Sequence, residues 1–338
     1  MKRRIIKLIV TALLMVCFSV FPANGFADTN EVYLGGIPAG FSLYTRGVTV
    51  VGIADVVTEN GKFSPGKDAG LQIGDVISFI DDKAVNSSED IAAAVDGKSE
   101  VKIKYTRNGE SAEGTIKPKK DALGQYKLGL FIRNFVSGIG TLTYVKNNRF
   151  TSLGHPIVDE NGSLIEIIGG SLINCTITGA IRGERGKAGE LKGIFLKNTP
   201  FAQAERNTPT GVTGIISDEE IERLELKKVE TGEAKVGAAV IYSTVKGSQP
   251  KEYAVSVVKI DKNEKNNKNL VLKINDEELL SVTGGIVQGM SGSPIVQDGK
   301  LVGAVTHVLL DDPQRGYGIL VENMLSASGM TAQSAASA

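Results

Sequence analysis

Beyond residue 126 the sequence consists of short apolar runs, rich in valine, isoleucine and threonine, that are separated by glycine, asparagine or aspartate. Runs of this length and composition are typical of β-strands joined by tight turns. The predicted strands are 128–132, 141–145, 164–168, 173–177, 238–243, 253–258, 270–274 and 301–305. Many short strands at this spacing favour a β-barrel or a β-sandwich. The chain is therefore expected to be mainly β, with one predicted surface helix at 217–228.

The first 27 residues have the pattern of a secretory signal peptide. Basic residues within the first seven positions precede an apolar stretch over 8–21, and small residues at 25 and 27 suit cleavage before Asp28. An uncleaved N-terminal anchor is the alternative, although the apolar stretch is short for a membrane span. In either case the rest of the chain is expected to be exported. In that setting the lone Cys175 fits packing better than catalysis.

Residues 30–118 carry a different order of signals. A β-branched strand at 48–53 precedes the segment "SPGKDAGLQIGDVISFID", which predicts a short helical turn, a Gly-Asp turn and a strand at 76–80. A capped helix follows, and a later hairpin turns at an Asn-Gly pair. This stretch resembles a PDZ domain, in particular the circularly permuted bacterial kind, so an α+β module is expected. The polar segment 119–125 is predicted to be a linker to a second domain at 126–325.

The resemblance to PDZ domains implies a peptide-binding loop. In these domains an apolar loop before a strand holds a peptide carboxylate on its N–H groups, and the peptide adds as a further strand beside a helix. Ala39, Gly40 and Phe41 are the predicted loop, because "PAGFSLYT" stands before the first strand. The alternative is a module that docks on its own catalytic domain and takes no free peptide.

The segment "VQGMSGSPIVQDGKLVGAV" suggests a nucleophilic serine. Gly289 and Gly292 flank Ser291, so the backbone can form a sharp turn that exposes the serine Oγ. The same turn can direct the N–H groups of Gly289 and Ser291 into one pocket, as an oxyanion hole requires. With the apolar hairpin that follows, the segment resembles the nucleophile segment of chymotrypsin-like serine proteases.

A histidine-based mechanism must use one of only two histidines. His155 follows a strand in "FTSLGHPIVD", where a polar ring can face a cleft, and it is the predicted general base. His307 lies in the strand that returns from the Ser291 hairpin, and it is predicted to line the substrate groove.

The third member of such a site should be a carboxylate that fixes the tautomer of the base. Asp276 follows a predicted strand and precedes the nucleophile segment, which makes it the predicted acid. Asp159, Asp311 and Asp312 remain alternatives, and each of them could equally be a solvated turn residue.

Segments from most of the chain together resemble the stage IV sporulation protein B peptidase family. They include "RNFVSGIGTLTYV", "SLGHPIVD", "GKAGELKGIF" and "TGGIVQGMSGSPIVQDGKLVGAVTHVLLDDPQRGYGI". The resemblance implies a chymotrypsin-like double β-barrel in which His155, Asp276 and Ser291 form the triad. One departure is "INDEELL", in which Glu277 stands where a proline is expected.

The same resemblance implies a serine endopeptidase of endospore formation, exported from the forespore into the space between its two membranes. It would cleave itself and then a membrane-bound regulatory protein. That cut would release an intramembrane metalloprotease, which activates the late mother-cell sigma factor. Two alternatives are a non-catalytic PDZ adaptor in the same compartment and an HtrA-type quality-control protease, although in the latter the PDZ domains follow the protease.

The remaining expectations concern ligands and the C-terminus. The chain has 38 basic and 38 acidic residues, so no net charge favours nucleic acid as a partner. The expected partners are protein substrates near a membrane, with no metal and no cofactor. The low-complexity tail at 326–338 is predicted to be disordered.

Overall fold

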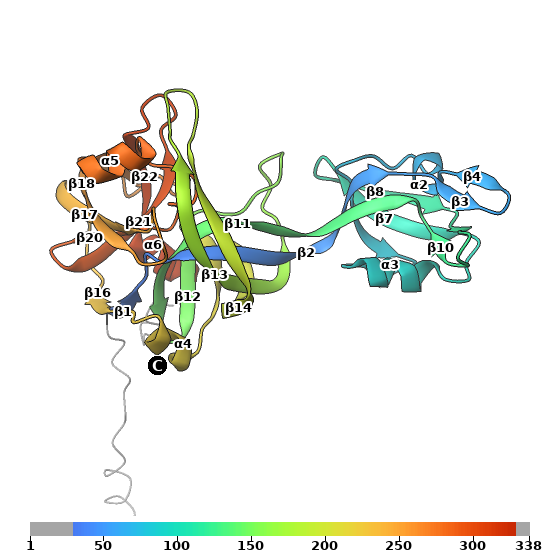
Figure 1. Cartoon of the computed structure of the whole chain (residues 1–338), viewed down its shortest axis with the longest axis horizontal. Coiled ribbons are helices and arrows are strands. Elements are labelled where there is room, and N and C mark those ends of the chain that lie inside the picture. Colours follow the sequence, from blue (N-terminus) through green and yellow to red (C-terminus); the bar gives the residue numbers. More distant parts are fainter. Residues whose placement is uncertain (1–29, 329–338) are drawn as a thin grey trace, which may run out of the picture. The chain divides into compact units, whose positions relative to one another are not determined.

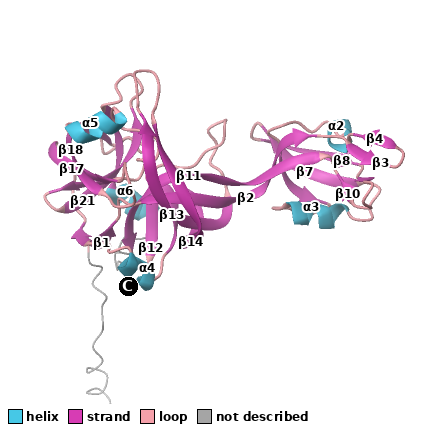
Figure 2. Ribbon diagram, viewed as in Figure 1, coloured by secondary structure: helices cyan, strands magenta, loops and turns pink. Residues whose placement is uncertain are grey.

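The computed structural model describes residues 30–328, and those from 31 onward belong to one compact unit. The predicted signal segment at 1–27 and the last ten residues of the predicted tail lie outside the described residues. The fold is mainly β, as expected, and Figure 2 shows only short helices among the strands.

Six strands close into a first β-barrel because β11 pairs with β12 along one edge and with β2 along the other. Round the ring, the order is β11-β12-β15-β14-β13-β2. Residues that are fully buried in its core include Leu43, Leu142 and Phe150. The elements of this part are β1 (Glu31–Leu34), β2 (Pro38–Ile53), β11 (Leu130–Lys146), β12 (Arg149–Leu153), β13 (Ile167–Ile181), β14 (Glu190–Thr208), β15 (Gly211–Ile215), α4 (Asp218–Arg223) and β16 (Lys228–Glu230).

A PDZ-like module is inserted into the hairpin that β2 and β11 form. The two strands lie side by side (Figure 1) and pair from Pro38 opposite Thr141 to Ile53 opposite Leu130, with a break in register between Arg133 and Phe135. The second half of β2 already belongs to the module, since Val48 and Val50 are buried in its core. The expected boundary at residue 30 is therefore corrected, because residues 31–45 are part of the first barrel.

The predicted elements of the module occur in the expected order, with further short strands between them, and the strand predicted at 76–80 is β5. Its elements are β3 (Val56–Thr58), β4 (Gly61–Phe63), α2 (Pro65–Asp68), β5 (Val76–Ile80), β6 (Lys83–Ala84), α3 (Ser88–Val95), β7 (Val101–Arg107), β8 (Glu110–Ile116), β9 (Lys119–Lys120) and β10 (Tyr126–Lys127). The segment 119–125 is not a free linker, because β9 pairs with β10 and Tyr126 packs against the module's core.

A second six-stranded barrel follows, with the order β17-β18-β19-β22-β21-β20, and it closes because β20 pairs with β17. The strand predicted at 270–274 is β19. Two successive six-stranded barrels form the chymotrypsin-like architecture that was expected. The elements are β17 (Gly237–Ser243), β18 (Lys251–Ile260), β19 (Leu270–Ile274), α5 (Glu277–Thr283), β20 (Pro294–Gln297), β21 (Lys300–Val308), β22 (Arg315–Leu320) and α6 (Val321–Ala327).

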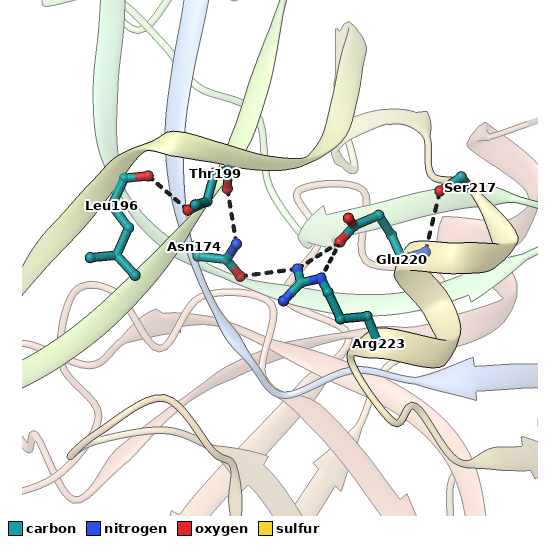
Figure 3. Close-up of polar contacts among 6 residues, drawn as sticks. All are labelled: Asn174, Leu196, Thr199, Ser217, Glu220 and Arg223. Carbon is teal, nitrogen blue, oxygen red and sulfur yellow. Dashed lines mark hydrogen bonds and ion pairs between the residues drawn. The ribbon is translucent and has the colours of Figure 1, made fainter.

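Helix α4 is attached to the first barrel by a polar network (Figure 3). Ser217 caps the helix, since its Oγ accepts a hydrogen bond from the N–H of Glu220 at 3.2 Å. Arg223 forms an ion pair with Glu220 at 2.6 Å and also donates to Asn174 Oδ1 in β13 at 3.4 Å. The helix ends at Arg223, so it is shorter than the predicted helix at 217–228.

Candidate active site

Ser291 stands in a turn whose backbone requires glycine on both sides. Gly289 has φ +96° and Gly292 has φ +92°, a region that side-chain-bearing residues rarely adopt. A Cβ on Gly292 would also lie 2.3 Å from Thr141 O and 2.5 Å from the N of Leu153. The nucleophile turn therefore packs directly on the first barrel, and only glycine permits that approach.

Thr141 in β11 holds this turn in one orientation. Its Oγ1 donates to Gly289 O at 3.0 Å, and its N–H donates to Ser291 O at 3.0 Å. With both carbonyls bound there, the N–H groups of Gly289 and Ser291 donate no hydrogen bond to any residue in 30–328. They are the unpaired donors that an oxyanion hole needs, so the predicted role of this pair is retained as a proposal.

His155 follows the end of β12 in a second turn with left-handed backbone. Leu153 has φ +71° and Gly154 has φ +74°. A Cβ on Gly154 would lie 2.9 Å from Thr306 Cγ2, so this turn abuts β21 of the second barrel. The Nδ1–H of His155 donates to Pro156 O at 2.9 Å. Because a carbonyl can only accept, this bond places the proton on Nδ1 and leaves the Nε2 lone pair free to act as a base.

The protonation of His155 is governed by its burial. Burial lowers the pKa of His155 from its ordinary value of 6.5, and the hydrogen bond to the Pro156 carbonyl opposes that effect. The ring is therefore neutral at neutral pH, which is the state that a general base requires.

The two turns meet at a cleft of about 510 Å³. Ser291, His155 and Gly289 all line it, and so does His307 in β21. The Oγ of Ser291 donates to Thr306 O at 2.9 Å, and within the described residues no hydrogen bond joins it to His155. The rest of the lining is mostly apolar: Phe41, Val136, Ile139, Leu153, Ile157, Ala188, Ile286, Val287, Val308 and Leu310.

The structure does not bring Asp276 to this cleft. Its side chain caps helix α5, where Oδ1 accepts from the N–H of Leu279 at 2.9 Å and Oδ2 accepts from the N–H of Ala254 at 3.3 Å. Val271 of β19 pairs with Tyr317 of β22, and Tyr317 pairs with His307 of β21, so Val271 and His307 lie at the same level of the barrel. Asp276 is five residues further along the chain than Val271. At ~3.3 Å per residue, it is displaced on the order of 15 Å along the barrel. The expectation that Asp276 supports His155 is therefore corrected: the carboxylate stabilises a helix.

The alternative acids do not line the cleft either. Asp159 Oδ1 closes a turn by accepting from the N–H groups of Asn161 and Ser163, each at 2.9 Å. Asp312 pairs with Arg315 at 3.4 Å, and Asp311 is exposed. No carboxylate is among the described residues that line the cleft.

We expect the Asp276→Asn protein to react with a fluorophosphonate probe within about 2-fold of the wild-type rate. Asparagine is as good a helix cap as aspartate, whereas Asp276→Ala should lose about 1 kcal/mol of stability. Labelling kinetics and thermal unfolding of both variants measure this. A folded Asp276→Asn protein that no longer reacts would return Asp276 to the catalytic set.

The predicted peptide loop of the PDZ-like module is also corrected. Ala39, Gly40 and Phe41 lie inside β2 and pair with both β11 and β13 of the first barrel. Ala39 is 0% exposed and Phe41 is 2% exposed, and a Cβ on Gly40 would lie 2.8 Å from the ring of Phe195. This segment builds the barrel and cannot receive a peptide within the module.

The module's groove lies instead beside helix α3. A cleft of about 470 Å³ is lined by Ile91 of α3, by Tyr126 and by residues 127–132. The N–H groups of Leu128 and Gly129 donate to no residue in the described part of the chain, and Gly129 has φ +67°. The sequence signal for this loop is "KLGLFI", an apolar segment with a central glycine just before a strand. The strand pattern predicts a catalytic-domain strand at 128–132, whereas β11 begins at Leu130.

Two other features of the described residues are relevant. In the range 30–328, no group of three or more His, Cys, Asp and Glu side chains is placed to hold a metal ion. No helix in the same range has the length and apolar character needed to cross a bilayer.

Comparisons with known proteins match both parts of the chain. The model of the SpoIVB peptidase S55 family matches residues 124–325, and the PDZ domain model matches residues 35–117. A zinc metalloprotease, RasP of Shouchella clausii (strain KSM-K16), is 33% identical over 129 residues, which is 36% of this chain and 30% of that protein. The chain thus spans less than a third of that relative's length. The PDZ domain of an SdrC-like protein from Listeria monocytogenes is 26% identical, with a TM-score of 0.21, over 26% of this chain and 87% of that one.

Proposed function

Since the chain belongs to the SpoIVB peptidase S55 family and is a serine peptidase, we propose that it is an exported endopeptidase of endospore formation. Its substrates would be the chain itself and a membrane-bound regulator, whose cleavage releases an intramembrane metalloprotease that activates the late mother-cell sigma factor. The observation that carries the peptidase mechanism is that Ser291, His155 and Gly289 line one cleft, and that the N–H groups of Gly289 and Ser291 donate to no residue in 30–328.

In the proposed reaction the Oγ–H of Ser291 leaves Thr306 O and turns to the Nε2 of His155. As Oγ attacks the peptide carbonyl, Nε2 takes the proton, and the developing oxyanion is held by the N–H groups of Gly289 and Ser291. His155 then gives the proton to the leaving amine, and the acyl-enzyme forms. A water molecule, deprotonated by the same Nε2, releases the acid and restores the Ser291 hydroxyl.

We propose that the groove beside α3 holds a peptide C-terminus and so brings substrates to the enzyme. The first residues of β11 pair with β2 along one edge only, which leaves the other edge open for an added strand. The unpaired N–H groups of Leu128 and Gly129 are donors suited to a terminal carboxylate.

A fluorescent peptide with an apolar C-terminal residue is expected to bind the full chain, and its C-terminal amide is expected to bind at least ~10-fold more weakly. The amide lacks the charge that the loop would hold. Fluorescence anisotropy measures both, and Ile91→Asp, which puts a charge on the apolar wall of the groove, should abolish binding. Equal affinity for the acid and the amide would contradict carboxylate recognition.

Cleavage of the membrane-bound regulator tests the proposed substrate. Membranes that contain the regulator are incubated with the purified chain, and the cut should appear with the wild-type protein and be absent with Ser291→Ala. A regulator that stays intact while the wild-type chain reacts with a fluorophosphonate would leave a serine peptidase with a different substrate.

A further inference from the structure

Among residues 30–328, no acidic side chain contacts the base of this site. The Pro156 carbonyl fixes the tautomer of His155, but no carboxylate lines the cleft in the described part of the chain. During acyl transfer His155 becomes an imidazolium, and in a Ser-His-Asp site the aspartate both orients that ring and stabilises its charge. The stabilisation of that charge is therefore left to other groups that contact the ring.

The ring of His307 lies against the ring of His155. The two ring centroids are 4.8 Å apart, and the ring planes are inclined by 37°. His307 lies where the pairing of β21 with β22 is irregular, between Val305 and His307. Thr306, at that irregularity, offers the carbonyl that binds Ser291 Oγ, so adjacent residues of one strand contact the nucleophile and the base.

The charge state of His307 suits this position. Burial, the neighbouring His155 and then Lys268 lower its pKa to about 4. From the adjacent elements, the titratable groups that face it are His155, Lys268 and Tyr317, which is its pairing partner in β22. Its Nδ1 is buried without a hydrogen-bond partner among the described residues. Because a pKa of about 4 leaves His307 neutral at neutral pH, it does not repel the imidazolium, and a neutral aromatic ring attracts a cation placed against it.

We propose that His307 is a positioning residue for His155: its ring holds the base in the cleft and shields the imidazolium in the transition state. This rests on the proposed peptidase mechanism and assigns to an aromatic ring the part that a carboxylate has in related sites. Substrate lining and support of the base are then two functions of one side chain.

Two substitutions of similar bulk separate an aromatic contact from simple packing. His307→Leu fills the space without a ring, and it should lower the rate of fluorophosphonate labelling and the kcat for a peptide substrate by roughly 30-fold. KM should stay within about 3-fold. His307→Phe keeps the ring, and it should retain activity within about 5-fold of wild type. Thermal unfolding of each variant reports whether it is folded.

The double mutant His155→Ala/His307→Leu distinguishes support of the base from a purely structural role of His307. In the His155→Ala background no imidazolium forms at position 155, so adding His307→Leu should cause no further loss of the residual labelling. Equal losses for Leu and Phe, a wild-type rate for Leu, or the same loss in the His155→Ala background would each overturn the proposal. If the wild-type chain itself does not label at Ser291, the proposed peptidase function fails instead.

Discussion

Ser291→Ala is expected to abolish labelling by fluorophosphonates and to lower peptide hydrolysis by roughly 10⁴-fold or more, while the protein stays folded. The substitution removes the atom that forms the acyl-enzyme, and losses of this size accompany removal of a serine nucleophile. Within residues 30–328 the Oγ of Ser291 makes a single hydrogen bond, to the Thr306 carbonyl, so the fold loses little with it. Mass spectrometry of the labelled protein and thermal unfolding measure the two effects.

Ser293 is the matched control because it stands two residues away and points into the second barrel. Its Oγ donates to Ser243 Oγ at 2.9 Å, and both side chains are 0% exposed. Ser293→Ala leaves a buried hydroxyl without its partner, so we expect a loss of about 1–3 kcal/mol in stability with labelling retained. Labelling that persists in Ser291→Ala, at any serine of the cleft, would refute the assignment of the nucleophile.

His155→Ala is expected to lower the labelling rate by at least ~10³-fold, since no other group lining the cleft is proposed to take the Ser291 proton. For the wild-type enzyme, kcat/KM should rise with pH through a midpoint below 6.5. The reason is that burial lowers the pKa of His155, so the ring stays neutral in more acidic solution than an exposed histidine does.

The same pKa shifts predict how stability changes with pH. Both histidines have folded-state pKa values below 6.5. Below that pH the two histidines are therefore protonated more fully in the unfolded chain than in the folded chain. Stability should therefore fall as the pH drops from 6.5 towards 4, and His155→Ala should weaken that dependence. Urea unfolding across this range measures it. For the kcat/KM profile, a midpoint above pH 6.5 would argue that a different environment surrounds His155 in solution.

Several features could be predicted from the sequence because they depend on local chemistry. The strands at 76–80 and 270–274 follow from β-branched runs between turn residues, and the turn at Ser291 follows from its flanking glycines. His155 could be predicted as the base because the chain has only two histidines and this one follows the end of a predicted strand. The double barrel came from the resemblance of whole segments to a known family, which strand patterns alone would not have distinguished from a sandwich.

The errors arose where long-range pairing decides the role of a residue. Ala39–Phe41 is an apolar segment near the start of a PDZ-like sequence, but pairing with β13 makes it part of the barrel. Residues 128–130, which line the groove beside α3, come at the end of the module in sequence. The reason is that the module interrupts the hairpin of β2 and β11, so the start of β11 is also part of the module. Asp276 has the spacing of a triad acid and also of a helix cap, and only the position of α5 decides between the two.

Because the module interrupts a hairpin, it has two covalent connections to the catalytic part instead of one. A single backbone nick anywhere within 54–129 would leave one fragment carrying β2 and the other carrying β11, and these strands are paired over much of their length in the same barrel. The nicked enzyme should migrate as one species under native conditions and as two bands after denaturation. An enzyme that cuts itself in this region would thus keep the groove beside α3 that is proposed to bind peptides, and shedding the module would require two cuts.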